Sequence, residues 1–302
     1  MKKFIIVLCI ILAAGITLGI TGAIIYAANG SNDMSKYTET ANKTALDGVN
    51  SIKIKCTVES IEVTPVDGDE ITFSYYEGDK LHHNLTVENG KLVFETENKM
   101  WAFWFWWGFN KESLTIKVGV PRAFAGDLEL DASTGDIKVS DIAGVKEFDA
   151  EISTGVINVD GVKAESISLK SSTGAIKLKN SEASGDVKVK ASTGKVVVDE
   201  VKAGAELGVE VSTGKVECNA DAKDVKLKSS TGEIRFNLKN ASVIFVKCTT
   251  GSVNGKIKGI KEEYGIDCST TTGDKNLANQ TGTTDKKLTV KTTTGSVSVY
   301  FE

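Results

Sequence analysis

The sequence predicts an all-β protein: a parallel β-solenoid of about nine coils of roughly 20 residues, with an irregular N-terminal β cap and one preceding transmembrane helix. Three observations support this fold. A Ser-Thr-Gly or Thr-Thr-Gly tripeptide occurs nine times between residue 133 and the end of the chain, apolar and polar residues alternate on both sides of it, and a long uncharged stretch lies near the N-terminus. A period of about twenty residues is typical of stacked repeats.

Residues 1–28 are predicted to form an N-terminal transmembrane anchor. Lys2 and Lys3 precede an uncharged, mostly apolar run from Phe4 to Ala28, which is long enough to cross a hydrocarbon core of about 30 Å. Because both lysines precede the run, we expect a single-pass cell-membrane protein whose N-terminus is cytoplasmic and whose remaining chain is extracytoplasmic. A cleaved signal peptide is the alternative, but its apolar region is usually shorter.

Residues 29–48 and 49–121 differ in their patterns. The first range is polar without apolar periodicity, which predicts a tether. The second contains short alternating segments such as 52–54, 61–63 and 71–73, separated by turn-forming pairs such as Asn89-Gly90. Because it lacks the tripeptide, we expect it to form the N-terminal β cap and irregular coils, including a tryptophan-rich segment.

Residues 122–302 are predicted to form the solenoid itself. Counted from each glycine of the tripeptide, the residues seven and five positions before it and two positions after it are almost always apolar, with polar residues between them. The alternation of apolar and polar residues on both sides of the tripeptide has a period of two, which indicates two strands per coil, each with one buried face. Stacking such coils about 4.8 Å apart builds a continuous aliphatic core. A β-sandwich is the alternative, but it does not need the same tripeptide at every second turn.

The tripeptide is interpreted as a corner between two strands. Its glycine is expected to supply a positive φ, and the threonine before the glycine is expected to stack on the threonine of the next coil. The structural turn residues predicted in this way are Thr134, Gly135, Thr154, Gly155, Thr173, Gly174, Thr193, Gly194, Thr213, Gly214, Thr231, Gly232, Thr250 and Gly251.

Seven aromatic residues, including all four tryptophans, crowd into one short segment of the cap. One interpretation is a lid that closes the N-terminal end of the solenoid core. The other is a contact site for the membrane interface, a partner protein or a glycan, because tryptophan favours interfaces and exposed apolar patches mark contacts. The candidate contact residues are Trp101, Phe103, Trp104, Phe105, Trp106, Trp107 and Phe109.

Composition and charge argue against several classes of function. The formal net charge of −4 offers no general attraction to a phosphate backbone, so no nucleic-acid partner is expected. Outward charges are interpreted as a solvated ladder in which acid and base alternate from coil to coil, so we expect no catalytic residues and no enzymatic activity. No cofactor or metal site is predicted. The cysteines are interpreted as small buried core residues rather than disulfides: Cys56, Cys218, Cys248 and Cys268.

The Ser-Thr-Gly-x-apolar-x-apolar repeats, the strand from Leu114 to Pro121 before them and the anchored N-terminus resemble the bacterial "putative adhesin" family of β-solenoid envelope proteins, a domain-of-unknown-function family. The resemblance covers roughly residues 45–302. The resemblance implies a solenoid in the cell envelope. It assigns no catalytic residues to this sequence. The sequence departs from the pattern where Lys275 replaces an apolar residue and Gly255 occupies a strand position, so the last coils are expected to be distorted.

Together these observations favour a non-catalytic, membrane-anchored extracytoplasmic protein with a structural, adhesive or binding role in the bacterial cell envelope. The alternative is an envelope sensor or regulatory protein that binds a membrane partner or envelope component through the tryptophan-rich tip, and a carbohydrate-active enzyme is less favoured. Expected partners are the membrane, through the anchor, and an envelope protein or glycan. Because the sequence ends within a strand pattern at 297–302, two alternatives are open for the C-terminal solenoid edge: the distorted last coils blunt it, or it self-associates with another chain.

Overall fold

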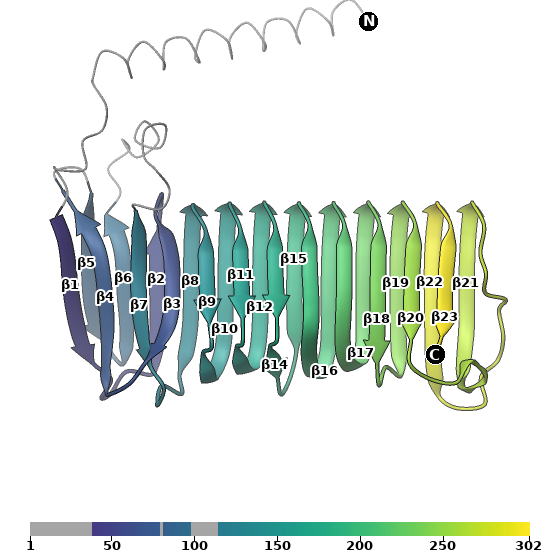
Figure 1. Ribbon diagram of the computed structural model, residues 1–302, viewed down its shortest axis with the longest axis horizontal. Coiled ribbons are helices and arrows are strands. Elements are labelled where there is room, and N and C mark those ends of the chain that lie inside the picture. Colours follow the sequence, from purple (N-terminus) through teal and green to yellow (C-terminus); the bar gives the residue numbers. More distant parts are fainter. Residues whose placement is uncertain (1–37, 79–80, 98–113) are drawn as a thin grey trace, which may run out of the picture.

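The computed structural model describes residues 38–78, 81–97 and 114–302 (Figure 1). Their strands form one hydrogen-bonded sheet of 23 strands, wound into a rod with two long facing layers. The predicted parallel β-solenoid is therefore confirmed. The predicted transmembrane anchor, residues 1–28, lies outside the described residues. Within the described ranges, the structure contains no helix that is both long enough and apolar enough to span a membrane.

The first layer contains the strands that run toward the tripeptide corners. Neighbours pair in parallel, except for the antiparallel hairpin at the N-terminal end. In spatial order the strands are β5 (His82–Glu88), β6 (Lys91–Glu97), β2 (Ser51–Cys56), β8 (Asp127–Thr134), β10 (Ala143–Thr154), β12 (Lys163–Thr173), β15 (Val187–Thr193), the second parts of β16 (Val196–Thr213) and β17 (Val216–Thr231), β19 (Val243–Thr250), β22 (Lys286–Thr294) and β21 (Tyr264–Thr272).

The second layer contains the strands that leave the corners. Its N-terminal pairs β1–β4 and β4–β7 are antiparallel. The strands are β1 (Thr38–Ala45), β4 (Glu70–Glu77), β7 (Thr115–Pro121), β3 (Ser60–Val66), β9 (Ile137–Ser140), β11 (Ile157–Asp160), β13 (Ile176–Lys179), the first parts of β16 and β17, β18 (Ile234–Lys239), β20 (Val253–Ile257) and β23 (Val297–Phe301), while the short β14 (Glu182–Ala183) pairs with β12 and β16.

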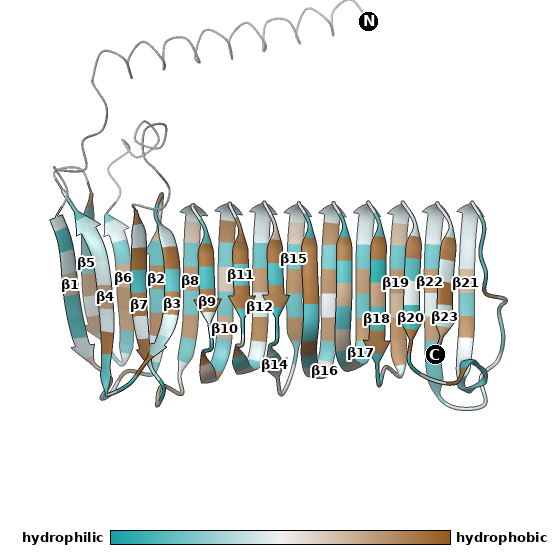
Figure 2. Cartoon of the chain, viewed as in Figure 1, coloured by the Kyte–Doolittle hydropathy of each residue, from teal (hydrophilic) through white to brown (hydrophobic). Residues whose placement is uncertain are grey.

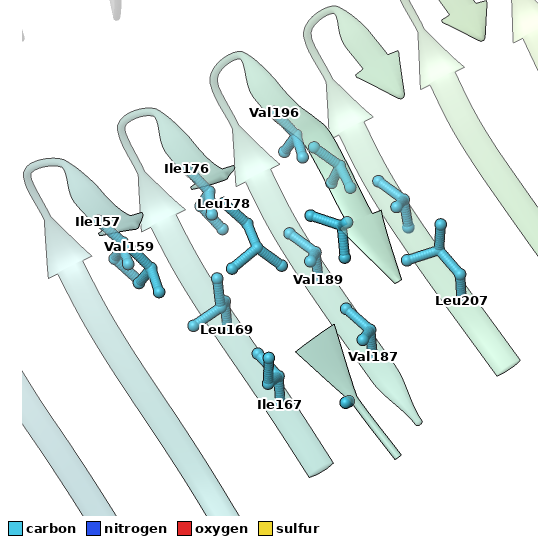
Figure 3. Packing of buried hydrophobic residues seen from close by; sticks show 14 of the residues in the cluster. Ile157, Val159, Ile167, Leu169, Ile176, Leu178, Val187, Val189, Val196 and Leu207 are labelled. Atoms are coloured by element: carbon cyan, nitrogen blue, oxygen red, sulfur yellow. The ribbon is translucent and has the colours of Figure 1, made fainter. Parts of the chain in front are cut away.

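The aliphatic core fills the space between the two layers. Ile157 and Val159 of β11 face inward beside Ile167 and Leu169 of β12, and the same arrangement repeats in the next coils (Figure 3). Figure 2 shows the corresponding alternation of hydrophobic and hydrophilic bands along the strands. Each fully buried aliphatic side chain contributes about 1.5–3 kcal/mol relative to exposure, so the period-two pattern is what holds the coils together.

The corner glycines have positive φ angles, between 128° and 149° across all nine tripeptides. A side chain on Gly155 would also overlap the carbonyl oxygen of Gly135 in the coil below, and one on Gly174 would overlap that of Gly155. Glycine is therefore required both by backbone conformation and by close stacking. The preceding threonines form one column, in which Thr154 is the register partner of both Thr134 and Thr173.

The last two tripeptide coils do not stack in chain order. β22 lies between β19 and β21, and β23 pairs with β20, so β21 is the outermost strand at this end (Figure 1). The rod thus has eight complete two-strand coils after the cap, whereas the sequence predicts nine. After Gly273 the chain does not form a second strand because Lys275 replaces an apolar residue, and its Nζ donates to the carbonyl oxygen of Cys268 at 2.6 Å.

Residues 274–285 lie along this end of the rod, and their side-chain amides form hydrogen bonds with backbone groups of the last strands. The amide of Asn276 pairs with both the N–H and the carbonyl of Val299, at 2.9 Å each. Gln280 exchanges backbone hydrogen bonds with Ile266, and Asn279 Oδ1 accepts from the N–H of Cys268 at 2.9 Å. The C-terminal strand is therefore not an open edge, and the chain's own polar groups satisfy much of the outer edge of β21.

The N-terminal cap is built differently. Residues 38–45, which the sequence places in the tether, form β1 along β4, because a threonine-rich segment suits an exposed edge strand. The coil of β6 and β7 stacks outside the coil of β2 and β3. In the sequence, residues 98–113 lie between β6 and β7. The tryptophan-rich residues Trp101–Phe109 lie outside the described residues.

Candidate binding groove

A groove of about 480 Å³ follows the corner edge of the first layer, where β10, β12, β15, β16, β17 and β19 end. Figure 1 shows these strand ends in one row along the upper edge of the rod. The groove is lined by charged residues four positions before each corner glycine and by the exposed hydroxyls two positions before it. Those hydroxyl residues are Ser172, Ser192, Ser212, Ser230 and Thr249.

The charged lining residues form a single column because each is the register partner of the next. Neighbouring members are separated by one strand spacing, about 4.8 Å, and point outward because the residues on either side of them point into the core. We call this set the groove column. In spatial order it contains Glu95, Lys55, Asp131, Glu151, Lys170, Lys190, Glu210, Lys228 and Lys247, and the register continues the column to Lys291, beyond the lining residues.

A second hollow of about 570 Å³ continues the groove toward the N-terminal cap. It shares Glu151 with the first, and its lining includes Glu95, Glu97, Asp131 and Lys55. The sequence interpretation of charges that alternate from coil to coil is therefore wrong. Like charges are register partners at Asp131 and Glu151, at Lys170 and Lys190, and at Lys228, Lys247 and Lys291, while Glu210 interrupts the lysines.

We define two blocks of the groove column. The acidic block has one lysine against three carboxylates, a net charge of −2: Lys55, Glu95, Asp131 and Glu151. The basic block has five lysines against one carboxylate, a net charge of +4: Lys170, Lys190, Glu210, Lys228, Lys247 and Lys291. The groove is therefore electrostatically polarised along the rod.

The ion pairs within the groove are exposed to solvent and range from 2.8 to 3.8 Å. Lys170 lies 3.5 Å from Glu151, and Glu210 lies 3.8 Å from Lys190 and 2.8 Å from Lys228. The hydrogen bond from Lys228 lowers the pKa of Glu210 below its ordinary value, so Glu210 is an anion at neutral pH and is unsuited to be a general acid.

A buried polar cluster lies in the cap and was not found by sequence reasoning. Nε2 of His83 lies 2.7 Å from Oε1 of Glu59, and the Thr96 hydroxyl donates to both carboxylate oxygens at 3.2 Å. The side chains of His83 and Glu59 are at most 3% exposed. The His83 ring contacts Tyr75 and Phe94, with centroids 4.7 and 5.1 Å away.

Glu59 occupies the corner of the β2–β3 coil, beside Gly135 of the first tripeptide. In the sequence, Glu59 is a charged residue at a position where the repeats have glycine. No sequence pattern connects Glu59 with His83, which is 24 residues away. Because Glu59 and His83 are buried and hydrogen-bonded to each other, they stabilise the cap corner. Neither residue lines the groove, although Thr96 does.

The four described cysteines, Cys56, Cys218, Cys248 and Cys268, are buried free thiols. Burial raises the pKa of Cys218 to about 12, which keeps it protonated and unreactive. Cys248 and Cys268 are on strands separated by β22, about two strand spacings apart and too far for a disulfide. No cluster of His, Cys, Asp or Glu in the described ranges is arranged to hold a metal ion.

Comparisons with known proteins identify the family of this chain. Two solved structures are similar to it: a "putative cell adhesion protein" from Clostridium sporogenes, with 8% identity, TM-score 0.23, covering 88% of this chain and 100% of that one, and a "putative adhesin" from Bacteroides fragilis, with 14% identity, TM-score 0.34, covering 87% and 97%. No curated protein matches this sequence. The family model described as Toastrack DUF4097 matches residues 49–300. The chain is therefore a member of the Toastrack DUF4097 family, in agreement with the "putative adhesin" resemblance of its repeats.

Proposed function

We propose that this chain is a non-catalytic, membrane-anchored extracytoplasmic protein that binds or supports a component of the bacterial cell envelope. The observation that carries the proposal is the continuous groove, which crosses six strands of the first layer and presents hydroxyl and charged groups at regular spacing. A rigid, repeated surface of this kind suits an extended ligand. The membrane location rests on the sequence of residues 1–28, and the envelope role rests on the family resemblance.

The arrangement of carboxylates favours binding over catalysis. Glu151 and Glu210 are three strand spacings apart, about 14 Å, whereas paired carboxylates that hydrolyse glycosides are about 5–9.5 Å apart. Asp131 and Glu151 are register neighbours and are the pair on which an enzymatic alternative would depend.

The test measures sedimentation of the full-length chain with isolated cell envelopes. Replacing Ser192 and Ser212 together by Trp fills the groove with bulky side chains, and we expect at least a tenfold loss of envelope binding. The matched control is Lys177→Trp, on β13 of the opposite layer, which leaves binding unchanged. Equal binding by both variants would overturn the groove as the site. Turnover of any envelope glycan that is abolished by Glu151→Gln would overturn the non-catalytic role.

A second candidate function is an envelope sensor that binds a membrane partner through the tryptophan-rich segment. The observation that favours it is that residues 98–113 lie in the sequence between β6 and β7, and that β6, which carries Glu95 of the acidic block, belongs to the coil stacked outside that of β2 and β3. Replacing Trp104 and Trp106 by Ser is expected to abolish liposome, glycan or partner binding with an unchanged β circular-dichroism spectrum. Loss of folding would instead support the lid interpretation.

A further inference from the structure

We propose that the basic block of the groove binds a linear polymer of phosphodiester-linked polyols, which lies along the axis of the rod. This assignment rests on the binding role proposed above and specifies its ligand. Five lysines face one carboxylate in the basic block, whereas the protein as a whole is acidic, with a net charge of −4. The positive charge is therefore concentrated on one surface, which is the arrangement that attracts an anionic partner.

The geometry of the block suits a polymer rather than a small anion. Lys170 and Lys190 are register partners, as are Lys228 and Lys247, so their Cα atoms follow one another at about 4.8 Å along the rod. An extended chain with regularly repeated charges meets successive ammonium groups, and the flexible lysine stems absorb small differences in repeat length. Many weak contacts along one chain then add up to useful affinity.

The lysines are available to a ligand. Lys247 makes no ion pair with any residue that the structure describes, and those of Lys170, Lys190 and Lys291 are long, at 3.5, 3.8 and 3.4 Å. Lys228 lies 2.8 Å from Glu210, but this pair is exposed to solvent. Exposed pairs of this kind contribute only about 0.2–1 kcal/mol. The cost of turning these ammonium groups from a carboxylate to a ligand is therefore small.

Lysine ammonium groups and hydroxyls together suit a phosphate polymer. Lysine binds phosphate as a point charge, whereas the planar fork of arginine pairs with carboxylate and phosphate alike. The chain has two arginines, Arg122 and Arg235, and neither lines the groove as the structure describes it. The exposed hydroxyls of Ser172, Ser192 and Ser212 along the same edge can hydrogen-bond to phosphate and polyol oxygens.

Two features disfavour a nucleic acid as the occupant. Proteins that bind single strands stack the bases on aromatic side chains, and none of the described residues that line the groove is aromatic. The acidic block, which begins at Glu151, also repels a polyanion and limits the bound segment to the coils from β12 to β22.

The test is binding of poly(glycerol phosphate) to the full-length protein by isothermal titration calorimetry. The variant combines Lys190→Gln, Lys228→Gln and Lys247→Gln, and the control combines Lys177→Gln, Lys202→Gln and Lys256→Gln, which change the net charge equally away from the groove. We expect the groove variant to bind about tenfold to a hundredfold more weakly at low salt. Its salt dependence should be shallower by about one unit of log–log slope per lysine, and the control should bind as the wild type does.

Several outcomes would overturn the proposal. Absence of binding, or equal losses in both triple variants, would show that the basic block is not the site. Polygalacturonate that binds as tightly would contradict the preference for phosphate, and an oligothymidine that binds as tightly would contradict the polyol assignment. If isolated envelopes bind the wild type but poly(glycerol phosphate) does not, the ligand assignment alone fails. If neither binds, the proposed function fails as well.

Discussion

The two ends of the rod are covered by different kinds of contact. An end left uncovered would expose apolar core and unpaired backbone groups. At the N-terminal end, Phe73, Tyr75 and Phe94 cover the core, with the Phe73 and Phe94 rings stacked at 5.0 Å, and antiparallel strands widen both layers. At the C-terminal end, the amides of Asn276, Asn279 and Gln280 pair with backbone groups of the last strands. The contacts described at the N-terminal end bury apolar surface, and those at the C-terminal end pair backbone N–H and carbonyl groups. The comparison predicts that the two ends respond differently to substitution.

The largest effect is expected from Phe94→Ala. Phe94 is fully buried and contacts Phe73, Tyr75 and His83, so its loss leaves a cavity and costs about 3–5 kcal/mol of unfolding free energy, measured by chemical denaturation. The control is Val87→Ala in the same hairpin, where the side chain is half exposed and the expected change is within about 0.5 kcal/mol. Similar values for both variants would contradict an apolar closure of this end.

A smaller loss is expected from Glu59→Ala. His83 then loses its carboxylate partner while it remains buried, and an unsatisfied buried group costs about 1–3 kcal/mol. The control is Glu77→Ala, because Glu77 Oε1 lies 3.9 Å from Nδ1 of His83 and its side chain is 36% exposed. Equal denaturation midpoints for the wild type and Glu59→Ala would show that the cluster does not stabilise the cap.

At the other end, Asn276→Ala is expected to cost about 1–2 kcal/mol, because the N–H and carbonyl of Val299 both lose a partner. Exposure of this strand edge should also increase self-association, which sedimentation velocity measures. Asn158→Ala, on an outward position of β11, is the matched control. A variant no more prone to associate than the wild type would show that Asn276 does not protect the edge.

The smallest expected effect is a gain in stability, from a substitution in the regular coils between the two ends. The hydroxyl of Ser229 is buried without a hydrogen-bond partner among the described residues, and alanine occupies the equivalent position at Ala191. Ser229→Ala should therefore raise the free energy of unfolding by up to about 1 kcal/mol. Thermal melting compared with the exposed change Ser230→Ala measures this, and a loss of stability in Ser229→Ala alone would contradict it.

Sequence reasoning succeeded where structure is local and repeated. The tripeptide and the apolar alternation around it predicted the two-strand coils, because each coil repeats the same backbone path. The order of strands at both ends was not predictable, since β21 and β22 carry the same apolar pattern and the same Thr-Thr-Gly corner, and either could pair with β19. The Glu59–His83 cluster depends on tertiary contact between separate strands. The charge blocks were visible in the sequence at Asp131, Glu151, Lys170 and Lys190, but their significance depends on register.

The interchange of β21 and β22 has a consequence for biosynthesis. A solenoid can grow one coil at a time as the chain emerges into the compartment where it folds, each new strand docking on the last. Here β21 is synthesised before β22, yet among the described residues β22 is the one strand that pairs with it. Until β22 is present, β21 must therefore stay unpaired or pair temporarily with β19. Residues 264–272 would then have to be displaced when 286–294 arrive. Completion of the rod is therefore expected to be slower than growth of its regular coils.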